Sequence, residues 1–163
     1  MNVKLLFHFS LVTMLTMLTM VSCRENSDSI EKQTDRSLLI EDVRSQVKSF
    51  RQADIELNSE KIIDLLWPEF TMLADGNYLV YQDVVKGSHA FMASLEVFKT
   101  DWNDLRIIPL GENHAISSFI FVDSLVSKDG TVNRSRGPNT FVWERRDSLW
   151  KVLYADADHY PIE

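Results

Sequence analysis

The second half of the chain constrains the fold most strongly, because four β-rich segments follow one another there with turn signals between them. These segments cover residues 104–110, 114–126, 131–146 and 149–158, and the tripeptide Lys-Asp-Gly at 128–130 separates the second from the third. Strands joined by short turns pair in antiparallel fashion. The segments therefore predict an antiparallel sheet.

The first half of the chain predicts helices instead. Apolar residues recur every three or four positions from residue 39 to residue 57, which is the pattern of a helix with one buried face. A second, shorter helix begins after Asn58, a suitable cap, and ends before Pro68. A third begins at Gly87, and the Asp75-Gly76 turn predicts a hairpin between the second and third helices. We expect an α+β fold with three N-terminal helices packed on one face of a curved antiparallel sheet.

The N-terminus reads MNVKLLFHFSLVTMLTMLTMVSC, in which Lys4 precedes an apolar run that ends before Cys23. This order is typical of a secretory signal, and MVSC resembles the lipidation site of bacterial lipoproteins, although Met20 replaces the usual aliphatic residue. The resemblance implies a signal peptide at 1–22, a lipidated Cys23 with a flexible tether at 23–36, and a folded domain at 37–163. The domain would then be lipid-anchored in the bacterial cell envelope, facing the periplasm or the cell surface. The alternative is an uncleaved membrane anchor.

Bulk properties exclude several classes of partner. The chain has one cysteine, so no disulfide forms within it and the core must hold the fold. A net charge of −7 argues against nucleic acid, because an acidic surface repels phosphates. The sequence has neither a Gly-rich phosphate loop nor a G-x-S-x-G motif, and we expect no cofactor.

The C-terminal segment GPNTFVWERRDSLWKVLYADAD, residues 137–158, resembles the last hairpin of the nuclear transport factor 2-like superfamily, which includes SnoaL-like and ketosteroid-isomerase-like domains. Residues 49–76 and 86–98 are similar to its helices and first strand in a milder way. The resemblance covers most of residues 37–158. It implies a cone, in which a strongly curved sheet wraps around an apolar pocket and the helices close the other side.

The catalytic set of the ketosteroid-isomerase members is not intact in this sequence. Phe50 stands where those proteins carry a tyrosine that donates a hydrogen bond, and Ala74 stands at the position of the base. Asn139 replaces the protonated aspartate that shares the oxyanion. Because the chemistry needs a base and donors to the oxyanion, we do not expect isomerase activity of that kind.

The closing strand supplies the polar candidates. Alternate side chains of a strand share a face, and the resemblance implies that Trp150, Val152, Tyr154 and Asp156 point into the cone. Asp156 is then a candidate general acid or base, with Tyr154 or Asn139 as a donor. The alternative is that the strand ends in water, with Asp156 half exposed.

The expected ligand-binding residues are Phe50, Phe91, Trp143, Trp150, Tyr154 and Asp156. For the aromatic residues among them, a role in the core is the alternative. Asp156, Asp158 and His159 carry metal-ligating side chains, but His159 alternates to the opposite face, so we expect no metal site.

Apolar residues on both faces of the sheet predict a homodimer. In the strand around residue 120, Phe119 and Phe121 share one face, and Ile120 and Val122 share the other. We expect Leu153, Ala155 and Ala157 of the last strand to add to the outer face. A second copy is the natural cover for such a face, and the alternative is that these residues are scattered surface apolars.

Three functions remain open at this point. The first is a lipid-anchored domain that binds a small, partly apolar molecule in its cone. The second is an enzyme, such as an isomerase, dehydratase or hydrolase, that acts on such a molecule through Asp156. The third is an interaction module whose pocket is filled by its own side chains. Cavity volume separates the third from the others, because ligand pockets usually measure about 300–1,000 Å³.

Overall fold

The structure is a computed structural model that describes residue 33 and residues 35–163. The expected signal peptide, Cys23 and the tether up to residue 32 lie outside the described residues. Leu39–Glu163 forms one compact unit, and the description below concerns this unit. In the part of the chain that the structure describes, no helix has the length and apolar character needed to cross a membrane.

In the part of the chain that the structure describes, helices form at the three places that the sequence predicts, but with shifted boundaries. The second helix ends at Asp64 rather than just before Pro68, because the next strand already begins at Leu66. The N-terminal helix extends to residue 55 and buries Val43, Val47 and Ala53 along one side. Helix α2 (Ser59–Asp64) is capped by Asn58, whose side chain accepts from the Lys61 N–H at 3.0 Å.

Helix α3 (Tyr81–Ser94) begins six residues before the predicted start at Gly87. The carboxylate of Asp83 accepts from the Val80 N–H at 3.2 Å, which satisfies a backbone donor at the start of the helix. A cap formed by the side chain of Asp83 is a weaker sequence signal than Gly87, at which the sequence predicts the start of the helix.

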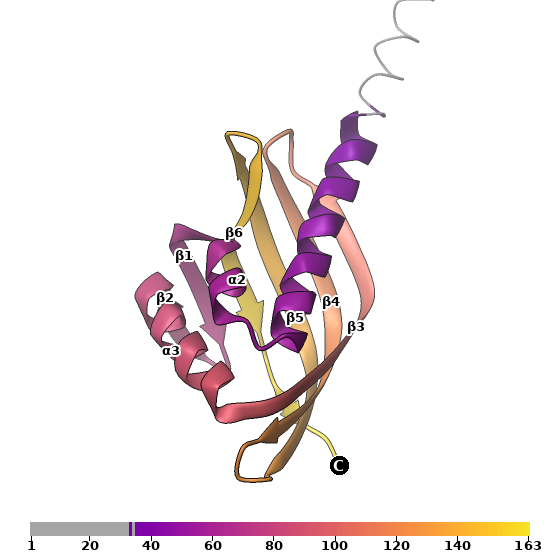
Figure 1. Cartoon of the computed structure of the whole chain (residues 1–163). Helices are drawn as coiled ribbons and strands as arrows, with labels where there is room; N and C mark the ends of the chain where they lie inside the picture. Colours follow the sequence, from indigo (N-terminus) through magenta and orange to yellow (C-terminus); the bar gives the residue numbers. More distant parts are fainter. Residues whose placement is uncertain (1–32, 34) are drawn as a thin grey trace, which may run out of the picture. The chain divides into compact units, whose positions relative to one another are not determined.

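Across the described residues, seven strands form one sheet. They are β1 (Leu66–Ala74), β2 (Asn77–Val80), β3 (Leu95–Pro109), β4 (His114–Ser127), β5 (Val132–Arg146), β6 (Leu149–Ala157) and β7 (Tyr160–Pro161). The order is β2-β1-β6-β5-β4-β3, and β7 pairs with β5. Figure 1 shows the helices on the concave side of this curved sheet.

The sheet is mixed rather than purely antiparallel, because β1 pairs with β6 in parallel. The Asp75-Gly76 turn makes the predicted hairpin of β1 and β2. Helix α3 then carries the chain from β2 at one edge to β3 at the other edge. Antiparallel pairing brings the chain back through β4 and β5 to β6. The last long strand therefore arrives beside β1 in the same direction.

A β-bulge at Leu153 reverses the side-chain alternation of β6. Trp143 of β5 pairs with Val152, but the preceding residue, Val142, pairs with Tyr154, so Leu153 is an extra residue in β6. A single extra residue moves every later side chain to the other face. Trp150 and Val152 are buried as predicted, and beyond the bulge Ala155 and Ala157 are buried instead of Tyr154 and Asp156.

The core lies between the N-terminal helix and the concave face of the sheet. Trp143 and Ser117 are both fully buried, and the Trp143 Nε1–H donates to Ser117 Oγ at 2.8 Å. Position 137 in β5 requires glycine, because the backbone of Asp158 lies so close that a Cβ at this position would collide with its carbonyl oxygen. The C-terminal segment therefore crosses directly over β5 at Gly137.

Candidate functional site: a cavity with an acidic wall

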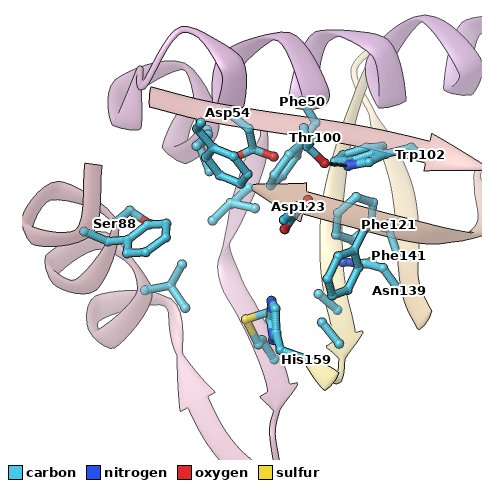
Figure 2. Close-up of a pocket in the computed structure, with 18 of the residues that line it drawn as sticks. Phe50, Asp54, Ser88, Thr100, Trp102, Phe121, Asp123, Asn139, Phe141 and His159 are labelled. Atoms are coloured by element: carbon cyan, nitrogen blue, oxygen red, sulfur yellow. Dashed lines mark hydrogen bonds between the residues drawn. The ribbon is translucent and has the colours of Figure 1, made fainter. Parts of the chain in front are cut away.

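A cavity of about 230 Å³ lies between the helices and the sheet (Figure 2). Aromatic side chains form much of its wall: Phe50, Phe70, Phe91, Phe98, Trp102, Phe119, Phe121 and Phe141. Polar side chains contribute at six positions: Asp54, Ser88, Thr100, Asp123, Asn139 and His159. Such a hollow, mostly apolar with a few polar groups, has the composition of a small-molecule site.

The aromatic part of the wall is fixed by packing between the rings. Trp102 of β3 stacks on Phe119 of β4 with ring centroids 4.0 Å apart, and Phe50 of the N-terminal helix lies 4.9 Å from Phe141 of β5. The Trp102 Nε1–H donates to Thr100 Oγ1 at 2.9 Å, which leaves the indole donor satisfied. These contacts fix the positions of the rings relative to one another on the cavity wall.

Two carboxylates face the cavity from different elements. Asp54 is in the last turn of the N-terminal helix, and Asp123 is in the middle of β4. Figure 2 shows both at the same side of the cavity, near Thr100. Asp123 is only 8% exposed. Carboxylates in such surroundings resist ionisation unless partners compensate for the lost water.

The pKa values of both groups reflect this burial. Burial raises the pKa of Asp54 well above its ordinary value, and the negative charge of Asp123 raises it further. Burial also raises the pKa of Asp123, although the Thr100 hydroxyl and the charge of His159 lower it in part. The pair therefore tends to retain protons that an exposed aspartate would lose.

Two acceptors at the cavity wall lack a partner. Among the residues that the structure describes, none donates a hydrogen bond to Asp123 Oδ1 or to Asn139 Oδ1, and both atoms are buried. Leaving a buried acceptor unpaired costs about 1–3 kcal/mol. A molecule that brings donors into the cavity would recover this free energy.

His159 ties the C-terminal segment to the β1–β2 turn. Its backbone N–H donates to Asp75 Oδ1 at 2.7 Å, and its Nδ1 lies 3.0 Å from Asp75 Oδ2. Its ring lies 4.8 Å from the ring of Phe121. Figure 2 shows His159 across the cavity from Asp54, so this contact with Asp75 fixes the opposite wall.

The structure brings only part of the predicted site together. Phe50, Phe91 and Asn139 line the cavity. Trp143 and Trp150 are buried in the core without lining it. They belong to the hydrophobic core, which is the alternative role that the sequence left open for the aromatic candidates.

Tyr154 and Asp156 lie on the outer face of the sheet, which corrects the predicted orientation. The bulge at Leu153 is the physical reason. The Tyr154 hydroxyl donates to Asp156 Oδ2 at 3.2 Å, and partial desolvation followed by this hydrogen bond raises the pKa of Tyr154. Neither residue contacts the cavity, so neither can act on a molecule bound there.

Sequence reasoning missed Asp54 and Asp123, although each follows a pattern that was used for its neighbours. Asp54 is four residues after Phe50, which places it on the same side of the helix. Asp123 continues the inward alternation of Phe119 and Phe121. No group of three or more potential metal ligands occurs in the region that the structure describes.

Comparisons with known proteins give the fold and a partial family match. Residues 88–158 match the family model of the calcium/calmodulin-dependent protein kinase II association domain. No curated protein sequence matches the chain at a significant level.

Solved structures resemble the chain over most of its length. A nuclear transport factor 2-like protein from Salmonella enterica has a TM-score of 0.69 at 13% identity, with 78% of this chain and 94% of that chain covered. A hexachlorocyclohexane dehydrochlorinase from Novosphingobium barchaimii has a TM-score of 0.67 at 12% identity, with 80% and 94% covered. A protein from Xanthomonas campestris, classed as a calcium/calmodulin-dependent protein kinase II association domain, has a TM-score of 0.65 at 19% identity, with 75% and 88% covered.

These similarities define the fold. The chain has the α+β fold of the nuclear transport factor 2-like superfamily, which confirms the resemblance of its C-terminal segment. Within that fold, residues 88–158 are similar to the kinase association domain in particular. The fold hosts enzymes and association domains alike, so function has to be argued from the cavity.

Proposed function

We propose that the domain binds one small, largely apolar molecule in the cavity, with a polar group of that molecule against Asp123 and Asn139. The observation that carries the proposal is a hollow with an aromatic wall and two unpaired buried acceptors. The volume of about 230 Å³ is slightly below the usual range of ligand pockets, which favours a compact ligand. A pocket filled by its own side chains would leave far less space.

Native mass spectrometry of the full chain, purified from its own host, tests this proposal. We expect a retained small molecule that is lost in Ala155→Leu, because the added side chain enters the cavity from the floor of the sheet. Ser118→Leu is the matched control, since the even-numbered residues of β4 point to the opposite face. Equal retention by Ala155→Leu, or no retained molecule and no binding from a compound library, would contradict the proposal.

A second candidate function is acid–base catalysis on the bound molecule. Two coupled carboxylates with raised pKa values in an apolar cavity are typical of catalytic acids and bases. Asp54 and Asp123 would take the place that the sequence suggested for Asp156, with Asn139 as a hydrogen-bonding group. Turnover that follows the ionisation of this pair, and that is lost in Asp54→Asn, would support catalysis.

We also propose that the domain is lipid-anchored through Cys23 and resides in the bacterial cell envelope. The support is the signal-like N-terminus, in which an apolar run ends at the single cysteine. In this arrangement the cavity would meet molecules outside the cytoplasmic membrane. Metabolic labelling of cells with a fatty-acid analogue tests the proposal, since the wild-type protein should be labelled and Cys23→Ser should not.

The outer face of the sheet is proposed as the surface of a homodimer. Ile116, Ile120, Val122 and Val142 lie on this face and are half-buried. Ala155 and Ala157 face inward instead, which reduces the apolar surface that the sequence predicted there. Light scattering of the purified protein should give the mass of two copies, and Ile120→Glu should give one.

A further inference from the structure

We propose, building on the ligand-binding function above, that the cavity selects an organic cation. The ligand would be a compact amine whose ammonium group lies at the side of Asp54 and Asp123 and whose apolar body lies against the aromatic wall. The inference rests on the charges, the unpaired atoms and the rings that face the cavity.

The charge of the cavity wall is unbalanced. Among the residues that the structure describes, the ionisable ones that line it are Asp54, Asp123 and His159, and none of the described lysines or arginines lines it. Arg51, one turn before Asp54 on the helix, donates to the Thr100 carbonyl at 2.6 Å and to Asp101 at 2.9 Å. Its guanidinium is therefore held by β3, and its partner Asp101 is exposed.

Within the described lining, the potential cation is the side chain of His159, and it is already paired. His159 contacts the Asp75 carboxylate through Nδ1. The charge of His159 lowers the pKa of Asp123 only in part, because burial has the larger effect. When both cavity carboxylates ionise, negative charge in the wall exceeds positive charge, and a ligand cation would balance it.

The unpaired atoms at the wall are both side-chain oxygens, and both act as acceptors when Asp123 is ionised. Asp123 Oδ1 and the Asn139 side-chain oxygen are buried and, within the described part of the chain, receive no hydrogen bond. A primary ammonium offers three donors, an alcohol offers one, and a carboxylate offers none. The donor count therefore ranks an amine above an alcohol, and an alcohol above an acid.

The aromatic rings favour the same ligand. Phe50, Phe121 and Phe141 line the cavity together with the carboxylates, and Figure 2 shows Asp123 between Phe50 and Phe121. The face of an aromatic ring attracts a cation by about 0.5–2 kcal/mol, with the larger values at desolvated sites. The rings also provide apolar contact for the body of an amine.

Proton linkage gives this inference a signature. In the empty cavity the two carboxyl groups tend to keep their protons. A bound ammonium would stabilise the ionised carboxylates, so binding of an amine would release these protons. The charged groups around the pair are Arg51 from the helix, Asp101 from β3, and His159 with Asp75. Affinity for an amine should rise with pH as the carboxyl groups ionise, until the amine itself loses its proton near pH 10.

Isothermal titration calorimetry with matched probes tests the inference on the full chain in lipid nanodiscs. The probes are benzylamine, benzyl alcohol and benzoate, with cyclohexylamine and cyclohexanol as a second pair. We expect each amine to bind at least about tenfold more tightly than its alcohol at pH 8, with an observed heat that differs among buffers because the released protons are taken up by the buffer. Benzoate should bind least.

Variants connect the preference to the named residues. Asp54→Asn and Asp123→Asn should each reduce the preference for amines, and Asp42→Asn on the exposed side of the helix should retain it. Circular dichroism identifies a variant that has lost its fold, in which case the other variant decides. Two results overturn the inference. If the alcohols bind as tightly as the amines or more tightly, the cation preference is wrong and the proposed ligand-binding function stands. If no probe binds, both the cation preference and the proposed ligand-binding function lose their support.

Discussion

Asp54 in the last turn of the N-terminal helix and Asp123 in β4 face the same cavity, and the negative charge of Asp123 adds to the burial that raises the pKa of Asp54. These two residues come from elements that are far apart in the sequence. Their coupling is therefore a property of the folded state, and it gives the stability of the protein a dependence on pH.

Asp54→Asn should stabilise the protein at high pH and have little effect at low pH. Because the pKa of Asp54 is raised in the folded state, the folded protein binds more protons than the unfolded chain between about pH 4 and the raised value. Stability is therefore lost as pH rises through that interval. Urea unfolding at pH 4 and pH 8 measures the difference between the variant and the wild type.

Asp42→Asn is the control for this measurement, since Asp42 is exposed on the same helix. The difference in unfolding free energy between Asp42→Asn and the wild type should be the same at the two pH values. A stabilisation of Asp54→Asn that grows toward acidic pH would show that the pKa of Asp54 is lowered rather than raised.

Gly137→Ala should destabilise the protein by about 1–3 kcal/mol, a range typical of a backbone that has to move. The added Cβ would collide with the Asp158 carbonyl oxygen, which belongs to the backbone and cannot rotate away. Gly87→Ala in α3 is the matched control, because no atom lies within 4 Å of its added Cβ. The control should be neutral or stabilising by up to about 1 kcal/mol, since alanine favours a helix. Thermal unfolding of both variants would show the order, and equal stability would contradict the close approach.

Ser117→Ala should cost about 1–3 kcal/mol of folding free energy, because it leaves the buried Trp143 Nε1–H without its acceptor. Ser118→Ala removes the same hydroxyl from the outer face of the same strand and should change stability by less than about 0.5 kcal/mol. Chemical denaturation measures both. A similar small effect of the two changes would mean that water replaces Ser117 as the acceptor.

Ala155→Asp and Asp156→Ala test the orientation that the bulge imposes on β6. Ala155 is 1% exposed, so a carboxylate there would be buried without a partner and should cost about 3 kcal/mol or more. Asp156→Ala removes only the surface hydrogen bond from Tyr154 and should cost less than about 1 kcal/mol. The reverse order in urea unfolding would place Asp156 inside.

Local signals predicted the parts of the fold that depend on local chemistry. Asn58 caps α2 and Asp75-Gly76 makes the β1–β2 turn as expected, because caps and turns depend on a few neighbouring residues. The parallel pairing of β1 with β6 depends on the route of the whole chain. The bulge at Leu153 depends on how β5 and β6 align, and nothing in the alternation of β6 alone indicates it.

The sequence predicted only part of the candidate site, because the rest of the site depends on how distant segments are arranged. Phe50, Phe91 and Asn139 line the cavity, as family resemblance and helical spacing suggested. Tyr154 and Asp156 were placed inside by assuming uninterrupted alternation, and one extra residue was enough to reverse them. Asp54 and Asp123 become a candidate pair only when the helix and β4 are placed on either side of the same hollow.

The parallel pairing of β1 with β6 also has a consequence for when the domain can fold. One long neighbour of β1 in the sheet is β6, which follows it only after β2, α3, β3, β4 and β5, so this side of β1 remains an open edge until β6 has been synthesised. Contacts between such distant segments slow folding and expose apolar surface in the meantime. A domain with this topology should be prone to association with other chains until β6 pairs with β1, and it should reach its native state only after that pairing.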